Sequence, residues 1–295
     1  MSAAMAKRLE GKTVLITGAS SGIGKSCAFE FARTAPKDLK LVLTARRVDR
    51  LHEIAREIKE EVGEGVKVLA VELDVSDAEQ VLARAPEISE ADVSVMFQTN
   101  VTGLINMTQA ILPIFKTRPD GGAGDIINIG SIAGREPYAG GSIYCATKAA
   151  VRAFTDALRK ELIDTRIRVM EIDPGQVETE FSVVRFYGDK SKADAVYAGC
   201  EPLTPDDIAE VVVFVAGRRQ NVVIADTLIF PSHQHKTRGT QTKYNASKVP
   251  PSRFQKRKGS IYAVPHSRDG RIDSNNSIAE KFQQKLVELG YAKKV

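Results

Sequence analysis

The chain has 295 residues, of which 43% are hydrophobic and 27% are charged, and its formal net charge is +5. This composition is typical of a soluble globular protein. No run approaches the ~18 apolar residues that a membrane span needs, which excludes an integral membrane protein of the helical kind. The three cysteines (Cys27, Cys145 and Cys200) lie far apart, so neither a disulfide framework nor a metal site is predicted. We expect a cytoplasmic protein without a membrane partner.

The positive charge is concentrated at the end of the chain. Residues 232–295 contain 14 Lys and Arg against 4 Asp and Glu, which leaves 28 basic and 33 acidic residues in residues 1–231. We therefore predict a single folded domain over 1–231 and a basic, mostly disordered tail over 232–295. Residues 277–289 of the tail have the pattern of a short helix. Nucleic acid binding by the tail is the less favoured alternative to a solvated charge run.

Strand-like runs alternate with helical patterns through the first part of the chain. The predicted strands are 12–17, 39–44, 67–73, 125–129, 168–172 and 222–230. The predicted helices are 25–33, 49–62, 89–116, 142–164 and 205–217. Residues 181–199 show no clear period, so we expect a mobile lid or loop there. This alternation predicts right-handed βαβ units and an α/β, doubly wound parallel sheet (Rossmann-like) in one domain.

A glycine-rich turn joins the first strand to the first helix. Its candidate ligand-binding residues are Gly18, Ser20, Ser21, Gly22, Ile23 and Gly24. Glycines allow a tight turn and close backbone approach, and the helix N-terminus offers N–H groups to a pyrophosphate. A tight turn without any ligand is the alternative.

The end of the second strand favours NADP over NAD. An acidic residue at this place would bind the ribose 2′-hydroxyl, but the chain has Ala45 there, followed by Arg46 and Arg47. Two guanidinium groups suit a 2′-phosphate, although solvated arginines are the alternative. Asp74 and Val75 follow the third strand, where Asp74 would meet the adenine edge or cap the next helix.

Tyr144 and Lys148 lie one helical turn apart and project from the same face. A nearby ammonium lowers the pKa of a phenol from about 10, which makes Tyr144 a candidate general acid or base. Ser131 ends the strand upstream of this helix. Asn100 stands inside the 89–116 helix, where asparagine is unfavourable unless it has a polar role. An ordinary amphipathic helix start is the alternative for the Tyr–Lys pair.

Taken together, these residues resemble the short-chain dehydrogenase/reductase family over roughly residues 9–231. Its cofactor motif TGxxxGxG is matched from Thr17 to Gly24, its catalytic serine, tyrosine and lysine by Ser131, Tyr144 and Lys148, and its helix asparagine by Asn100. The resemblance implies that Tyr144 exchanges the substrate proton, Lys148 lowers its pKa and holds the ribose, and Ser131 binds the reacting oxygen. Asn100 would order a relay water.

A further family segment, PGxVxT, adds cofactor-binding candidates at Pro174, Gly175, Val177 and Thr179. Stretches such as GSIYCATK look like NADP-dependent 3-hydroxy acid dehydrogenases, which oxidise serine and allo-threonine. The resemblance thus implies hydride transfer between NADP(H) and a small hydroxy acid, in a homo-oligomer. Arg185 is the candidate for the substrate carboxylate, and an exposed lid arginine is its alternative.

One departure from the family is large. Only 25 residues separate Asp74 from Asn100, and nothing there resembles the strand and Asn-Asn-Ala-Gly segment that the family places at the centre of its sheet. A missing central strand would leave unpaired backbone edges inside the sheet. The alternative function is therefore a catalytically impaired relative, or a truncated isoform, that acts only as a binding protein.

Overall fold

The computed structural model describes residues 3–75, 90–119, 121–185, 189–191, 197, 201–232 and 234. The predicted tail beyond 234, with its helix at 277–289, lies outside these residues. No helix within the described ranges combines the length and the apolar character needed to cross a membrane.

The first half of the chain forms a three-stranded parallel sheet in the order β1-β2-β3. Its elements are α1 (Ala3–Leu9), β1 (Thr13–Thr17), α2 (Gly22–Thr34), β2 (Leu39–Ala45), α3 (Val48–Val62) and β3 (Val66–Glu72). Thr13 of β1 pairs with Lys40 of β2, and Leu39 of β2 pairs with Val66 of β3. β2 is therefore the inner strand, which agrees with its almost completely buried side chains.

The second half forms another three-stranded parallel sheet in the order β4-β5-β6. Its helices are α4 (Glu90–Phe97), the π-helical turn η1 (Gln98–Thr102), α5 (Gly103–Lys116), the short 3-10 turn η2 (Ile132–Gly134), α6 (Ser142–Glu161), α7 (Glu180–Arg185) and α9 (Pro205–Ala216). Its strands are β4 (Ala123–Ile129), β5 (Arg166–Pro174) and β6 (Asp226–Ile229).

Two predicted boundaries are wrong. The strand predicted at 222–230 is only Asp226–Ile229, because β6 pairs with no more than the last four residues of β5. The loop predicted for 181–199 begins inside a helix, α7, whose six residues are too few to show a helical period in the sequence.

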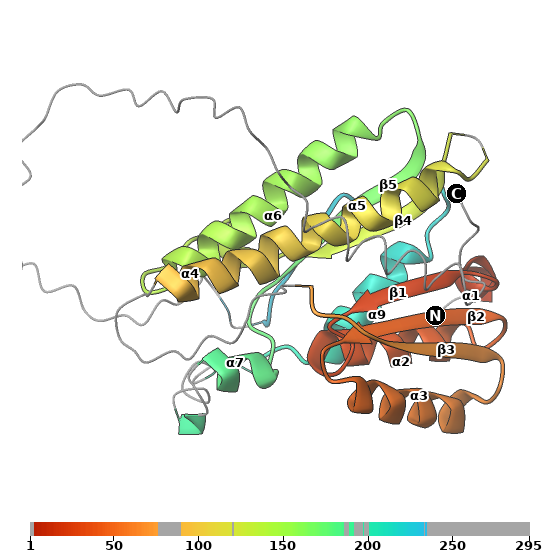
Figure 1. Ribbon diagram of the computed structural model, residues 1–295, viewed down its shortest axis with the longest axis horizontal. Coiled ribbons are helices and arrows are strands. Elements are labelled where there is room, and N and C mark those ends of the chain that lie inside the picture. The colour runs from red at the N-terminus through yellow and green to blue at the C-terminus, as the bar shows by residue number, and fades with distance from the viewer. Residues whose placement is uncertain are drawn as a thin grey trace, which may run out of the picture.

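The predicted loss of a central strand agrees with the arrangement of the two sheets. Among the described strands, β1 is hydrogen-bonded only to β2, and β4 only to β5, so each has one edge without a partner strand. Figure 1 shows β1–β3 and β4–β5 as two separate groups of strands. The α/β class and the parallel, helix-covered architecture are confirmed, with the sheet divided into two.

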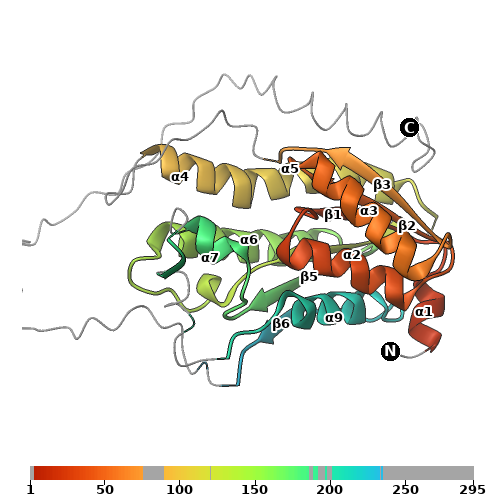
Figure 2. The same cartoon turned by 90° about the horizontal axis from the view of Figure 1, so that it is seen from below.

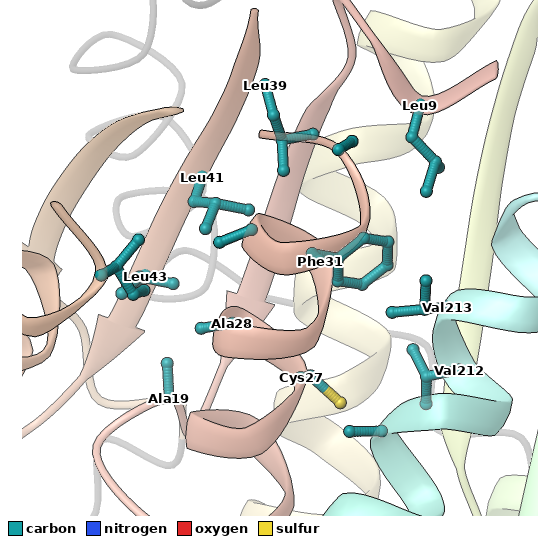
Figure 3. Close-up of a cluster of buried hydrophobic side chains, with 14 of the residues drawn as sticks. Leu9, Ala19, Cys27, Ala28, Phe31, Leu39, Leu41, Leu43, Val212 and Val213 are labelled. Carbon is teal, nitrogen blue, oxygen red and sulfur yellow. The ribbon is translucent and has the colours of Figure 1, made fainter. Parts of the chain in front are cut away.

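One hydrophobic core crosses the division on the face covered by α2 and α9. Phe31 and Cys27 of α2 point toward Val212 and Val213 of α9 (Figure 3), and the two helices run side by side (Figure 2). The core also contains buried leucines of β2 and, from the second sheet, Met170 and Ile172. Burying apolar surface contributes about 20 to 33 cal/mol of stability per Å². This layer therefore connects the two sheets strongly.

Helix α5 connects the sheets on the opposite face. Met107 and Ile111 pack with Val42 and Val71 of the first sheet. Leu112 and Phe115 pack with the second sheet, around Val169 of β5. Helices on both faces thus hold the two sheets together, and the carboxyl ends of the strands remain on one side, where parallel sheets bind ligands.

Candidate active site

The turn between β1 and α2 has the backbone that the sequence predicts. Gly18 (φ 66°) and Gly22 (φ 50°) adopt the left-handed conformation that favours glycine. A Cβ atom on Gly24 would lie 2.5 Å from the Gly18 carbonyl oxygen, so only glycine lets the helix start this close to the strand. Among the described residues, the side chain of Ser21 at the N-cap bonds no first-turn N–H group of α2. Those N–H groups can therefore donate hydrogen bonds to an anionic ligand.

Arg47 lies directly against this turn. Its Nη2 donates to Ser21 Oγ at 2.9 Å and to Ser20 Oγ at 3.3 Å, and it forms an ion pair with Glu180 Oε2 at 3.3 Å. Arg46 is exposed beside it, after the buried Ala45. The structure thus brings Arg47 to the glycine-rich turn, where a phosphate on the ribose could replace Glu180 as its anion.

The segments after β3 and β5 border the same region. Val75 packs against the start of α5, since a Cβ atom on Gly103 would lie 2.5 Å from the Val75 carbonyl oxygen, and Asp74 is half-buried beside it. Thr179 lies beside the glycine-rich turn, with its Cγ2 3.6 Å from a Cβ atom placed on Gly22. Of the segment 174–179, Gly175 N–H donates to Ile229 O at 2.7 Å. Val177 bridges to Leu203.

Asn100 is held in the π-helical turn η1 rather than in regular α-helix. Its Nδ2 donates to Thr147 Oγ1 at 3.1 Å, and that hydroxyl donates in turn to the carbonyl oxygen of Tyr144 at 2.8 Å. π-Helical turns are common at functional sites. The turn therefore links Asn100 to the helix that carries Tyr144 and Lys148. Thr147 is completely buried, and its role was not predicted.

Ser131 follows β4 and begins the turn η2. It is almost buried, and its Oγ accepts a hydrogen bond from Ala133 N–H at 3.1 Å. The turn packs on α6, where a Cβ atom on Gly134 would lie 2.7 Å from the backbone of Lys148. This contact brings the turn that Ser131 begins against the helix that carries the predicted Tyr–Lys pair.

Lys148 and Tyr144 lie together, with the ammonium 5.9 Å from the centre of the phenol ring. Lys148 Nζ also donates to the carbonyl oxygen of Ile129 at 2.9 Å. Burial lowers the pKa of Lys148 to about 8, and the nearby Glu171 and Asp173 oppose this shift. Lys148 is consequently a cation at neutral pH, which is the state that favours a phenolate on Tyr144.

The carbonyl of Ile129 belongs to the edge of β4 that has no partner strand. Gly130 N–H donates to Ile172 O of β5, so the neighbouring residue Ile129 turns its backbone groups away from β5. Lys148 therefore satisfies a carbonyl that an added strand would otherwise bond. The position of the Lys148 ammonium therefore depends on the absence of a described partner strand at this edge of β4.

Two of the predicted site features are not placed by the structure. The side chain of Arg185, the last residue of α7, lies outside the described residues, so its predicted contact with a substrate carboxylate is untested. Of the predicted tail the structure describes Ser232 and Gln234, and Gln234 Oε1 accepts a hydrogen bond from Gln176 N–H at 2.8 Å. This contact joins residue 234 to the segment 174–179 and was not predicted.

Comparison with known proteins agrees with the geometry. The short chain dehydrogenase family profile matches residues 12–88 and 82–187. The NADP-dependent 3-hydroxy acid dehydrogenase of Schizosaccharomyces pombe is 55% identical, over 77% of this chain and 95% of its own. The serine 3-dehydrogenase of Agrobacterium fabrum is 33% identical, over 75% of this chain and 94% of its own. The solved closed form of serine dehydrogenase complexed with NADP⁺ has a TM-score of 0.62 and 36% identity, covering 74% of this chain and 94% of that one.

The same comparisons indicate where the chain is short. The alignment with the yeast relative has 253 positions, whereas 77% of 295 residues is about 227, so about 26 aligned positions have no residue in this chain. The family match also breaks into two segments that meet at residues 82–88, between β3 and α4. Fold, site geometry and relatives agree, and the chain belongs to the short-chain dehydrogenase family.

Proposed function

We propose that this protein is an oxidoreductase that transfers a hydride between NADP(H) and the alcohol or carbonyl of a small 3-hydroxy acid, such as serine or allo-threonine. The observation that carries the proposal is the Tyr144–Lys148 pair, which lies against the turn that Ser131 begins. The glycine-rich turn after β1, which can bind an anion, lies at the carboxyl end of the first sheet. The named activities of the yeast and bacterial relatives support the same reaction class and the same cofactor.

The described residues fit NADP. The turn from Gly18 to Gly24 would hold the pyrophosphate, Arg47 with Arg46 the 2′-phosphate, and Asp74 with Val75 the adenine. The residues Pro174, Gly175, Val177 and Thr179 would border the nicotinamide. When bound, the cofactor supplies the hydride acceptor or donor.

The chain's own groups would handle the proton and the substrate oxygen. Ser131 Oγ would hydrogen-bond the reacting oxygen, and Tyr144 would take its proton in the oxidation direction. The Lys148 ammonium stabilises the phenolate that this step requires. Asn100, fixed by Thr147, would hold a water that returns the proton to solvent. We propose that Arg185 binds the carboxylate of the substrate.

The test is NADP⁺ reduction by the purified protein with serine, followed by absorbance of NADPH. We expect turnover, and we expect Tyr144→Phe to lower it at least 100-fold, in line with the contribution of a positioned general base. NADPH binding, measured by fluorescence titration, should change little in this variant and thus serves as the folding control. Turnover that survives Tyr144→Phe would remove Tyr144 from the mechanism.

A second candidate function, that of a catalytically impaired relative or truncated isoform acting only as a binding protein, is favoured by one observation. The ammonium of Lys148 bonds the unpaired edge carbonyl of Ile129, in a sheet divided where the family has a continuous one. Micromolar NADPH binding with no turnover on any small hydroxy acid would support this candidate.

The remaining expectations are also proposals. We infer that residues 1–231 are the folded domain and 232–295 a basic tail that does not bind nucleic acid, on the strength of the charge distribution. We further propose a cytoplasmic homo-oligomer, such as a homotetramer. Light scattering of the full chain tests the oligomer, and salt-dependent binding to DNA or RNA would contradict the interpretation of the tail.

A further inference from the structure

A buried acidic pair lies behind the proposed active site. Glu171 and Asp173 occupy alternate positions of β5, so both side chains point to the face opposite Met170 and Ile172, which are in the α2–α9 core. Each acid is only 1% exposed. Carboxyl groups are rarely buried so completely without a defined partner or role.

Glu171 and Asp173 pack closely against the end of β4. A Cβ atom on Gly130 would lie 1.9 Å from Asp173 Oδ1 and 2.3 Å from Glu171 Oε1, so the absence of a side chain at Gly130 makes room for both carboxyl groups. Gly130 stands between two residues of the site. Ile129 accepts the bond from Lys148 Nζ, and Ser131 is the predicted substrate contact.

The two acids have different partners. Arg135 Nε donates to Asp173 Oδ2 at 2.7 Å, and Arg135 Nη2 lies 3.2 Å from Asp226 Oδ2 of β6. Asp173 is thereby paired with a cation. Within the described part of the chain, Glu171 Oε1 is buried without a hydrogen bond to any cation, and the protonated carboxyl faces Asp173, which can accept its proton in a hydrogen bond.

The charges that face Glu171 therefore come from four elements: Asp173 on β5, Asp226 on β6, Arg135 after η2 and Lys148 on α6. Burial, and then Asp173, raise the pKa of Glu171 to about 8, with Asp226 adding to the shift and Arg135 opposing it. Burial lowers the pKa of Lys148 to about 8, against the attraction of Glu171 and Asp173. The ionisation of Glu171 and that of Lys148 are therefore linked, because a negative charge on Glu171 favours the charged form of Lys148.

We propose that Glu171 is a positioning residue for the Tyr144–Lys148 pair. When Glu171 loses its proton, its carboxylate behind Gly130 keeps Lys148 a cation on the alkaline side of neutrality. The proton that Glu171 releases leaves a negative charge close to the ammonium, and that charge opposes loss of the ammonium proton. Tyr144 then retains the adjacent cation that it needs at a pH where Lys148 alone would be neutral. Glu171 acts through Lys148 and does not touch the substrate. As a role in catalysis, the inference rests on the proposed function.

The decisive experiment titrates Lys148 itself in the full chain. Protein labelled with ¹³C-lysine is followed by NMR, and the Lys148 signal is identified by its loss in Lys148→Met. Glu171→Gln keeps the size and a donor toward Asp173 but cannot ionise, so we expect the titration midpoint of Lys148 to fall by about half a pH unit or more. Glu171→Asp keeps an ionisable group and should restore part of the shift. Glu60→Gln, an exposed acid on α3, should leave the midpoint unchanged.

Turnover provides the second readout. The ratio of kcat/KM at pH 9 to that at pH 7 should fall at least threefold in Glu171→Gln relative to the unchanged chain, and Glu171→Asp should recover part of it. An unchanged Lys148 midpoint in Glu171→Gln overturns the inference, whatever the turnover. A shifted midpoint in a protein that never turns over any hydroxy acid supports the electrostatic coupling and refutes the proposed function instead.

Discussion

The division of the sheet predicts that restoring the family's central strand will stabilise the protein. The change is insertion, between residues 82 and 88, of the segment that the Schizosaccharomyces pombe relative carries and this chain lacks. The position is where the family match breaks, and the missing length is about 26 aligned positions. The matched control is a Gly/Ser segment of the same length at the same place, which cannot form a stable strand.

The size of the effect follows from the two strand edges. In a parallel ladder alternate residues bond to each side, so Thr13, Leu15 and Thr17 of β1 turn their backbone groups away from β2, and Asp125, Ile127 and Ile129 of β4 turn theirs away from β5. These residues offer on the order of ten backbone groups to a new strand, each worth roughly 0.5 to 1.5 kcal/mol when paired. Ordering the inserted segment offsets part of this gain. We expect the free energy of unfolding to rise by several kcal/mol over the control.

Urea denaturation followed by far-UV circular dichroism measures this difference, because the chain has no Trp to report it by fluorescence. The same protein should also turn over faster, since a strand N–H would bond Ile129 O and release Lys148 toward Tyr144 and the cofactor. If the yeast segment and the Gly/Ser segment give the same denaturation midpoint, the two edges do not accept a strand and the interpretation of the divided sheet is refuted.

Two further predictions concern charge. Arg47→Ala should weaken NADP⁺ binding about tenfold or more while leaving NAD⁺ binding nearly unchanged, because only NADP⁺ carries the 2′-phosphate. Conversely, Glu180→Gln should tighten NADP⁺ binding by up to about fivefold, since an exposed ion pair worth roughly 0.2 to 1 kcal/mol no longer competes for Arg47. Calorimetric titration with both nucleotides measures each effect, and equal changes for NADP⁺ and NAD⁺ would contradict the assignment. Stability should also depend on Glu171, whose raised pKa means that the folded state binds a proton that the unfolded state releases. Its contribution is complete below pH 4.5 and declines as the pH rises through about 8, by on the order of a few kcal/mol. Between pH 5 and 8, the urea concentration at the denaturation midpoint should fall with rising pH for the natural chain and should change less for Glu171→Gln. The lowered pKa of Lys148 acts in the opposite direction, mainly above this range.

The features that the sequence predicted are those set by residues close together in the chain. Strand and helix periods, the glycine-rich turn and the Tyr144–Lys148 spacing each depend on a few consecutive residues. The two arginines after β2 are likewise a local signal, and the structure brings Arg47 to the turn. Local backbone preference and side-chain direction fix such features before any tertiary contact forms.

The features that were missed are pairings between distant positions. Thr147 with Asn100, Arg135 with Asp173 and Gln234 with Gln176 each join residues far apart in the chain, and nothing local marks them as partners. One available signal was overlooked. Acids at alternate positions of an otherwise apolar strand, Glu171 and Asp173 in β5, are unfavourable in a buried sheet unless something specific holds them.

The division of the sheet separates the two tasks of the site. The residues that would hold the cofactor phosphates, the glycine-rich turn and Arg47, belong to the first sheet, whereas Ser131, Tyr144 and Lys148 belong to the second. Ser131, Tyr144 and Lys148 are fixed by contacts within the second half, whereas Arg47 bonds the serines of the turn in the first half and also pairs with Glu180 of the second half. Their mutual position depends on the helices that cross both sheets and on single contacts such as Thr179 with the turn at Gly22. A displacement of about 1 Å between reacting groups can lower the rate of a step such as hydride transfer about 100-fold, whereas the residues that would bind the phosphates lie together at the first sheet. The absent strand should therefore reduce turnover far more than affinity for NADP, and a protein that binds the cofactor well yet reacts slowly is the outcome that this architecture favours.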